Sequence, residues 1–246
     1  MEESGSATRG PIALVGSGEY LPEMMAIEAS LLEGRPSRYV QLATAAAMDG
    51  ADVVRRWHEL GAAQAKRLGV EQVVVPVVNR QDAERDDFAD AIAGAGLIYL
   101  SGGDPDYLCE TLRGTKVWRS ILDAWQAGAA LAGCSAGALA LGSWVPSFDD
   151  PSSGMPALGP LEHLVLLPHF NRLSSFIPDF EARLSVPQAG STVIGVDELT
   201  AIVGGPSDWT VQGHGSAWLL SAPDRRELVS GTTFTVPDAN VSERST

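Results

Sequence analysis

The sequence predicts an α/β fold: a three-layer, doubly wound and mostly parallel sheet with strands added at its C-terminal end. Short apolar runs alternate with helical segments of about ten residues or more, and glycine turns follow the first and fourth runs. The chain has 246 residues, of which 45% are hydrophobic, which is enough for one large domain with a buried core. We therefore expect a single domain over residues 1–246, with frayed tails at 1–10 and 237–246.

The strands and helices expected up to residue 141 follow from this alternation. A proline begins the first helix and Gly34 follows its end, and these residues are common start and stop signals of a helix. Because right-handed crossovers place the carboxyl ends of parallel strands on one rim, we expect a ligand site on that rim. The predicted strands are 11–15, 39–42, 73–75, 97–100 and 130–132, and the predicted helices are 22–32, 53–68, 82–93, 107–112, 117–126 and 136–141.

The amino-acid composition of the sequence changes after residue 141. Residues 142–158 are rich in Ser, Pro, Asp and Gly and predict a long loop, and loops of this length are often functional. A buried strand at 164–167 and a helix at 171–184, interrupted near Pro178, are expected next. Short β-like runs then predict extra strands that complete the sheet without forming a second domain, at 192–196, 200–203, 209–212 and 217–220.

The charge balance argues against several classes of partner. Lys and Arg number 17 against 31 Asp and Glu, a net charge of −14, which would repel nucleic acid and anionic lipid. No apolar run approaches the roughly 18 residues of a membrane span. The polar first residues lack the core of a signal peptide, so a cytoplasmic protein is expected.

We expect no cofactor and no metal. The two cysteines, Cys109 and Cys134, cannot by themselves form a disulfide framework or a zinc site and should be free thiols. The segment Gly16-Ser17-Gly18 lacks the third glycine of a dinucleotide-binding fingerprint. No phosphate-binding loop and no histidine–carboxylate spacing typical of a metal site is present.

The pattern Gly-x-Ser-x-Gly at residues 133–137 is the clearest catalytic signal. An apolar strand precedes it and an alanine- and leucine-rich helix follows it, the setting in which a sharp turn lifts a serine Oγ above the edge of the sheet. The helix N-terminus offers N–H groups to a developing oxyanion. Cys134 would be flanked by alanines if it stood at the centre of the turn, so the glycine spacing favours Ser135 as the nucleophile and places Cys134 in the core. A tight structural turn is the alternative.

A nucleophilic serine needs a base, and four histidines are available. His58 lies in a predicted amphipathic helix and should be a surface residue, His163 could lie at a solvated strand edge, and His214 lies in a glycine turn. His169 follows the apolar run at 164–167 and so should lie at a strand end on the functional rim. We take it as the general base.

The base in turn needs an orienting acid. Asp149 and Asp150 lie in the predicted loop, whereas Glu198 follows the apolar run at 192–196. A rigid strand end holds a carboxylate better than a loop does, which favours Glu198. All three remain candidates, since the chain is rich in acidic residues.

The segment Ser101-Gly102-Gly103-Asp104 ends the fourth predicted strand. Glycines allow backbone N–H groups to approach a carbonyl oxygen, so an N–H from Gly102 or Gly103, together with that of Ala136, could form an oxyanion hole. A strand-to-helix turn with Asp104 as the helix N-cap is an equally good interpretation.

Taken together, these segments resemble the serine peptidase family that contains dipeptidase E and cyanophycinase, whose fold is similar to that of class I glutamine amidotransferases. The resemblance extends from about residue 12 to residue 220. It implies Ser135 as nucleophile, His169 as base and Glu198 as orienter, without a metal. The segments that carry it are Gly16-Ser17-Gly18-Glu19, Gly102-Gly103-Asp104, Gly133-Cys134-Ser135-Ala136-Gly137-Ala138, Pro168-His169-Phe170-Asn171-Arg172, Gly195-Val196-Asp197-Glu198-Leu199-Thr200-Ala201 and Val211-Gln212-Gly213-His214-Gly215.

The resemblance implies hydrolysis of small aspartyl or isoaspartyl peptides, with Asp104 and Arg172 contacting the substrate. Asp104 stands where the family usually has Asn or Gln, and the arginines after His169 are fewer than in cyanophycinases. A homodimer is possible. The competing interpretations are a non-catalytic binding or regulatory member of the amidotransferase-like fold and, against the glycine spacing, hydrolysis of glutamine through Cys134.

Overall fold

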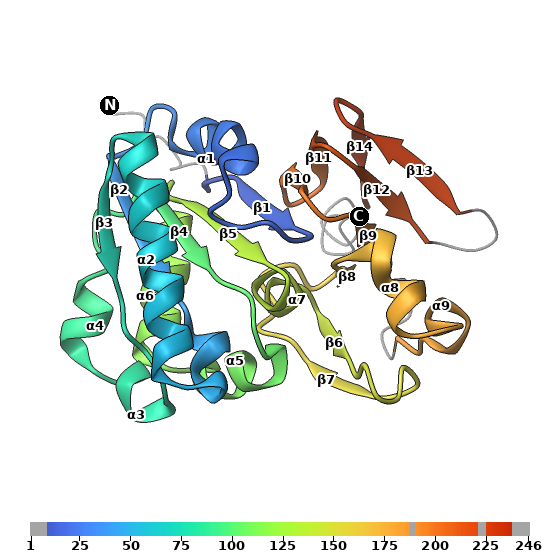
Figure 1. Cartoon of the computed structure of the whole chain (residues 1–246), viewed down its shortest axis with the longest axis horizontal. Coiled ribbons are helices and arrows are strands. Elements are labelled where there is room, and N and C mark those ends of the chain that lie inside the picture. Colours follow the sequence, from blue (N-terminus) through green and yellow to red (C-terminus); the bar gives the residue numbers. More distant parts are fainter. Residues whose placement is uncertain (1–8, 187–189, 221–224, 238–246) are drawn as a thin grey trace, which may run out of the picture.

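The computed structural model describes residues 9–186, 190–220 and 225–237 (Figure 1). In this part of the chain an eight-stranded sheet has the order β14-β11-β10-β1-β5-β4-β2-β3. Within this order, the run β1-β5-β4-β2-β3 is parallel throughout, as the sequence predicts. They are β1 (Ile12–Val15), β5 (Ala130–Cys134), β4 (Leu97–Leu100), β2 (Arg38–Leu42) and β3 (Glu71–Val74).

Antiparallel strands extend this sheet beyond β1. β10 pairs with β1 so that Ile202 lies opposite Leu14, and β11 and β14 follow in the same sheet. The predicted additions at 200–203 and 209–212 are therefore confirmed. Their bounds are β10 (Thr200–Gly204), β11 (Asp208–Gly213) and β14 (Thr233–Thr235), the last of which was not predicted.

A second sheet of four strands has the order β13-β12-β9-β8. The prediction that runs 192–196 and 217–220 complete the main sheet is thus wrong, because apolar alternation identifies a strand but not its partner. β8 and β9 are parallel neighbours, and β12 and β13 continue antiparallel. The strands are β8 (Leu164–Leu167), β9 (Thr192–Val196), β12 (Ser216–Leu219) and β13 (Arg226–Val229).

Asp197, at the end of β9, helps to hold this second sheet together. One oxygen of its buried carboxylate accepts the backbone N–H of Ser216 at 3.0 Å, and the other accepts the indole N–H of Trp218 at 3.0 Å. Both donors belong to β12. The two sheets share one core, since Ile194 of β9 and Ile202 of β10 belong to the same buried apolar cluster.

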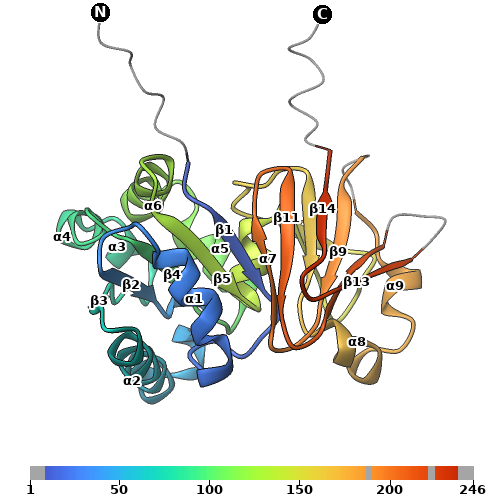
Figure 2. The same ribbon diagram turned by 90° about the horizontal axis from the view of Figure 1, so that it is seen from above.

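Helices cover both faces of the main sheet (Figure 2). Side chains alternate along a strand, so Ala13 and Val15 of β1 pack in the cluster that α1 and α2 complete, whereas Ile12 and Leu14 pack in the cluster of α5, α6 and α7. This is the predicted three-layer arrangement. The helices are α1 (Met25–Leu32), α2 (Ala51–Leu68), α5 (Pro105–Leu112), α6 (Lys116–Gln126) and α7 (Ala136–Leu141).

Some helices differ from the prediction. The expected helix 82–93 is two short helices, because Arg85 adopts an extended conformation, with φ −75° and ψ 132°, and interrupts the helical path. The expected helix 22–32 begins as a 3₁₀ turn. The segments are α3 (Arg80–Ala83), α4 (Asp86–Asp90) and the 3₁₀ turns η1 (Pro22–Met24) and η2 (Thr44–Asp49).

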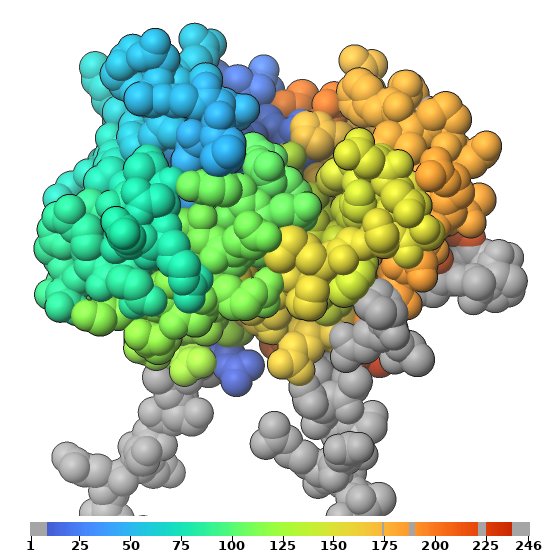
Figure 3. All heavy atoms as spheres, turned by 90° about the horizontal axis from the view of Figure 1, so that it is seen from below, coloured from blue at the N-terminus to red at the C-terminus, as the bar shows by residue number. Residues whose placement is uncertain are grey.

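The expected loop at 142–158 contains a hairpin of β6 (Trp144–Pro146) and β7 (Gly154–Pro156). Arg113, directly after α5, donates to the carbonyl oxygens of Pro156 at 2.5 Å and Ala157 at 2.9 Å. These hydrogen bonds hold the hairpin against the end of α5. In Figure 3 the yellow hairpin fills the surface between α5 and α8–α9. The prediction of a long loop is therefore wrong over these two strands.

The helix expected at 171–184 is interrupted as predicted. It forms α8 (Phe170–Phe176) and α9 (Phe180–Arg183), with Pro178 between them. The predicted tails lie mainly outside the described residues. Gly10, however, is buried, and its N–H donates to Trp125 O at 2.9 Å, so the chain is already ordered before β1.

A carboxyl group is buried between α1 and the main sheet. Glu28 is 2% exposed, and its Oε2 accepts the hydroxyl of Tyr39 at 3.0 Å. Burial raises the pKa of Glu28 from about 4.5 to about 7, because the ionised form loses its hydration. The folded chain therefore favours the protonated acid.

This buried acid predicts a pH dependence of stability. The free energy of unfolding should fall as the pH rises from about 4.5 to about 7, because the unfolded chain releases this proton first. Glu28→Gln removes that contribution, so the variant should lose less stability between pH 5 and pH 8 in urea unfolding. Glu23→Gln, at an exposed position nearby, is the control. Parallel pH profiles for wild type and Glu28→Gln would contradict the assignment.

Candidate active site

The turn between β5 and α7 carries Ser135 at the edge of the main sheet. Its φ of 50° and ψ of −110° are a strained conformation for a residue with a side chain, as expected at a sharp strand-to-helix turn. A Cβ at Gly133 would overlap the carbonyl of Gly137, and a Cβ at Gly137 would overlap the carbonyl of Leu100. The flanking glycines of the pattern are thus required by close backbone packing.

The side chain of Ser135 meets an imidazole from the second sheet. Its Oγ lies 3.0 Å from Nε2 of His169, and Nδ1 of His169 lies 3.0 Å from Oε1 of Glu198. A carboxylate can only accept a hydrogen bond, so Nδ1 donates to Glu198 and Nε2 is left to accept the serine hydroxyl. The three side chains form one hydrogen-bonded chain.

The parallel pair β8–β9 positions the histidine and the glutamate. Leu167 lies opposite Gly195 in this pair, so the strands end side by side, and His169 and Glu198 follow their ends. His169 adopts a left-handed conformation with φ 51° just before α8. The side chain of Asn171 accepts the backbone N–H of Glu198 at 3.1 Å and fixes the turn after β9.

The alternative acids lie elsewhere. Asp149 and Asp150 are exposed in the turn of the β6–β7 hairpin. Asp150 accepts hydrogen bonds from the N–H and hydroxyl of Ser152, which lower the pKa of its carboxyl group, and its Oδ1 lies 3.8 Å from Arg183. The structure brings Glu198, and neither aspartate, to the histidine.

The remaining histidines lie apart from the serine. His163 is buried, and its Nε2 lies 3.0 Å from the carbonyl oxygen of Pro206, so the expectation of a solvated strand edge is wrong. His58 is half-buried in α2, contrary to the expected surface position, and burial lowers its pKa. His214 is exposed in the turn between β11 and β12.

The loop after β4 brings Gly103 beside Ser135. Gly103 and Ala136 line the same cavity as Ser135, and Ala136 begins α7, where an N–H has no acceptor one turn earlier in the helix. Gly102 differs, because its N–H donates to Oε1 of Glu19 at 2.9 Å. The expectation that the Gly102 N–H faces an oxyanion is therefore wrong, and its contact with Glu19 anchors the loop.

The predicted substrate contacts face other groups in the structure. Oδ1 of Asp104 accepts the N–H of Tyr107 at 3.0 Å, so this side chain is the N-cap of α5. Arg172 is exposed on α8, with its Nε 3.8 Å from Oε2 of Glu198. Their roles in substrate binding stay predictions.

Glu19 is a buried residue whose role the sequence did not reveal. While its Oε1 binds Gly102, its Oε2 accepts the thiol of Cys134 at 2.8 Å. Burial and the neighbouring carboxylate raise the pKa of Cys134 well above its ordinary value, which keeps the thiol protonated and poorly nucleophilic. The prediction that Cys134 points into the core is confirmed. The signal for Glu19 was its place directly after the glycine turn of the first strand.

A cavity of about 320 Å³ opens at Ser135 and His169. It lies at the carboxyl ends of the strands, where open sheets of this kind bind ligands. Apart from the groups already named, its walls are mainly apolar side chains of α7, α8 and the β6–β7 turn. The Ser135 hydroxyl is therefore reached through an apolar recess.

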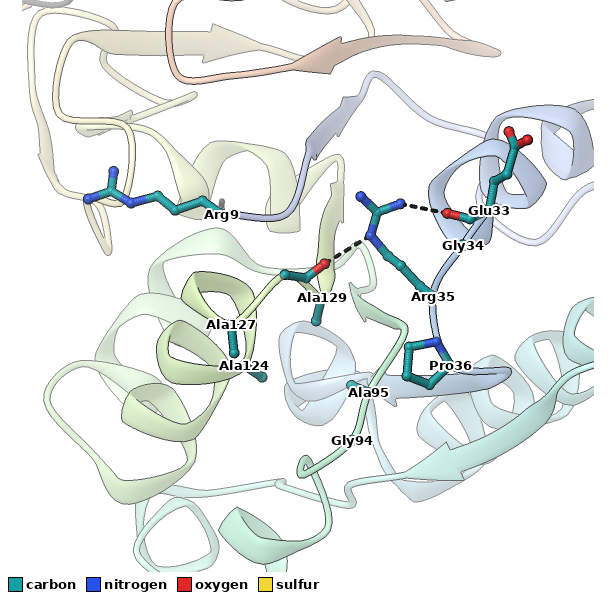
Figure 4. Close-up of a pocket in the computed structure, with 11 residues that line it drawn as sticks. Arg9, Glu33, Gly34, Arg35, Pro36, Gly94, Ala95, Ala124, Ala127 and Ala129 are labelled. Carbon is teal, nitrogen blue, oxygen red and sulfur yellow. Dashed lines mark hydrogen bonds between the residues drawn. The ribbon is translucent and has the colours of Figure 1, made fainter. Parts of the chain in front are cut away.

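A second cavity, of about 520 Å³, lies at the opposite edge of the sheet (Figure 4). Arg9, Pro36, Ala95 and Ala129 line it just before β1, β2, β4 and β5 begin. Arg35 there donates to the carbonyls of α1 and of the turn before β5, so its guanidinium connects backbone segments. No histidine, serine or cysteine is among the described residues that line this cavity.

Metal-binding clusters and membrane-spanning helices are both absent from the described ranges. No group of three or more His, Cys, Asp or Glu side chains there could hold a metal ion. None of the helices in residues 9–186, 190–220 and 225–237 is both long and apolar enough to cross a membrane.

An elbow serine in contact with a histidine on an α/β sheet is the arrangement of serine hydrolases. Comparison with protein families matches residues 40–208 to peptidase family S51. A peptidase from an acI-B1 actinobacterium, in a crystal structure, is 38% identical, with a TM-score of 0.87 over 94% of this chain and 98% of that chain. The chain belongs to family S51 and is a serine-type peptidase, which confirms the predicted resemblance.

A more distant structure supports the fold alone. A protein described as peptidase E from Listeria monocytogenes EGD-e is 16% identical, with a TM-score of 0.61 over 85% of this chain and all of that one (100%). A comparison with curated proteins gave no match.

The anchoring of the Gly102 loop predicts an effect on catalysis. A Cβ at Gly102 would lie 3.3 Å from Cβ of Ser135, so this loop packs directly on Ser135. Glu19→Ala should slow labelling of the serine by a fluorophosphonate by about 10- to 100-fold, since small displacements of an oxyanion donor are costly. Cys134→Ala, which removes only the thiol contact, should slow it less. Equal labelling of wild type and Glu19→Ala would refute this role.

Proposed function

We propose that Ser135, His169 and Glu198 form a catalytic triad that hydrolyses an amide bond of a small peptide. The observation that carries this proposal is the continuous hydrogen-bonded chain from the serine hydroxyl through the imidazole to the carboxylate. Membership of a serine peptidase family agrees with it.

In this mechanism Oγ of Ser135 attacks the peptide carbonyl while Nε2 of His169 takes the hydroxyl proton. Glu198 holds the imidazole in the required tautomer and stabilises the imidazolium. We propose the N–H groups of Gly103 and Ala136 as donors to the oxyanion. His169 then gives its proton to the leaving amine, and water hydrolyses the acyl-enzyme by the reverse proton transfers.

The non-catalytic alternative would require the serine and the histidine to lie beyond hydrogen-bond reach, or the hairpin to fill the cleft. Oγ and Nε2 are instead 3.0 Å apart, and the cavity beside them is open. Hydrolysis of glutamine through Cys134 is disfavoured, because that thiol is buried against Glu19. A peptidase therefore remains the function that the geometry supports best.

Replacing Ser135 tests the nucleophile. Ser135→Ala should abolish fluorophosphonate labelling and lower kcat by about 10⁴-fold or more, since triad residues act as a unit. Ser143→Ala is the matched control, because its Oγ donates to Leu164 O, away from the cavity. If Ser135→Ala keeps wild-type labelling, the nucleophile is another residue.

The choice of acid has its own test. Glu198→Gln should lower kcat by about 10³- to 10⁴-fold, because an amide cannot enforce the imidazole tautomer. Asp149→Asn and Asp150→Asn should leave kcat within about twofold, as expected of exposed substitutions. Steady-state kinetics on a dipeptide substrate measures all three. A larger loss in either aspartate variant than in Glu198→Gln would move the orienting role to the hairpin turn.

A further inference from the structure

The cavity beside Ser135 has a composition that constrains the substrate. Its apolar walls come from Leu139 on α7, from Leu173 and Phe176 on α8 and Ile177 directly after it, and from Phe148 at the turn of the β6–β7 hairpin, with two prolines completing the lining. Its volume of about 320 Å³ is at the small end for ligand pockets, which suits one side chain and its backbone.

The charged residues that line this cavity disfavour an acidic side chain. No lysine or arginine is among the described residues that line it, and the ionisable acid there is Glu198. Arg172 lies outside the lining, with its guanidinium toward Glu198. An aspartyl side chain in the cavity would lose its hydration without gaining a cation, which is unfavourable.

Two aromatic side chains at the cavity remain available to a ligand. Phe176 is 67% exposed although it is a large apolar residue, and Phe148 is 36% exposed, with its other side against Phe180 at 5.7 Å between ring centroids. They come from segments far apart in the sequence. Exposed apolar groups that meet at a cavity are typical of a site that an apolar ligand covers.

The position of the cavity relative to the reacting atoms indicates which part of the substrate enters it. Gly103 and Ala136, the proposed oxyanion donors, line the cavity together with Leu139, one turn further along α7. A carbonyl held between these donors and Oγ of Ser135 directs the residue that bears it into the recess. The leaving amine must instead face Nε2 of His169 to receive its proton.

We propose that this cavity binds an apolar side chain on the acyl residue of the substrate, so that the peptidase cleaves after residues such as leucine or phenylalanine in preference to aspartate. This inference rests on the proposed triad, which places the scissile carbonyl at Ser135. It assigns the apolar recess a role in choosing the substrate.

The test compares dipeptides that differ only in the acyl residue: Leu-Gly, Phe-Gly, Ala-Gly and Asp-Gly, with the glycine released measured by chromatography. The kcat/KM for Leu-Gly and Phe-Gly should exceed that for Asp-Gly by about 100-fold. The p-nitrophenyl esters of hexanoate, acetate and succinate test the same subsite with an activated leaving group. Their rates of hydrolysis by Ser135→Ala give the background to be subtracted. Hexanoate should be the fastest ester.

A charge placed at the cavity should shift this preference. Phe176→Arg puts a cation beside the recess and should lower the leucine-to-aspartate ratio of kcat/KM by about tenfold or more. Val229→Arg is the matched control, since Val229 is 58% exposed on β13 and does not line the cavity. The leucine-to-aspartate ratio of kcat/KM for Val229→Arg should equal that of wild type. Circular dichroism should show that both variants are folded.

Fluorophosphonate labelling separates the two proposals. Wild type that labels at Ser135 but hydrolyses Asp-Gly and the succinate ester as fast as their apolar counterparts would overturn the apolar subsite and leave the triad intact. An unchanged ratio in folded Phe176→Arg would also overturn it. Absence of labelling in wild type would overturn the triad, and the subsite with it.

Discussion

The hydrogen bond between Ser135 Oγ and His169 Nε2 joins two different sheets, and the site depends on it. The serine follows β5 of the main sheet, whereas the histidine follows β8 of the second sheet. Their 3.0 Å separation therefore requires the two sheets to pack in a fixed relation. The apolar cluster shared by Ile194 and Ile202 supplies that packing.

The anchoring of the loop after β4 is a second contact that holds separate segments of the chain in place around Ser135. Glu19, just after β1, reaches both the Gly102 N–H and the Cys134 thiol, so one buried carboxylate connects three strand ends. A buried carboxylate is stable when hydrogen-bond donors satisfy it. This contact fixes Cys134, the residue before Ser135, and the Gly102 loop that packs against Ser135.

Much of the main sheet could be predicted, because its strands and helices are marked by local patterns. The turn at Ser135 was recognisable from its glycines, and His169 and Glu198 from their places after apolar runs. The β6–β7 hairpin was missed because its strands are three residues long and contain Pro146 and Pro156, which hide any alternation. The second sheet and the contacts of Glu19 were missed because they depend on pairing between distant segments.

The proposed triad is divided between two sheets, and this division separates two properties of the site. His169 and Glu198 follow the ends of two adjacent, hydrogen-bonded strands, so they would keep their mutual geometry if the two sheets moved relative to one another. Ser135 follows β5 of the main sheet, so a core substitution between the sheets would alter the distance from its Oγ to the imidazole without disturbing the imidazole–carboxylate pair. Under the proposed mechanism, turnover would therefore respond to substitutions in the protein interior, at positions that do not contact the substrate.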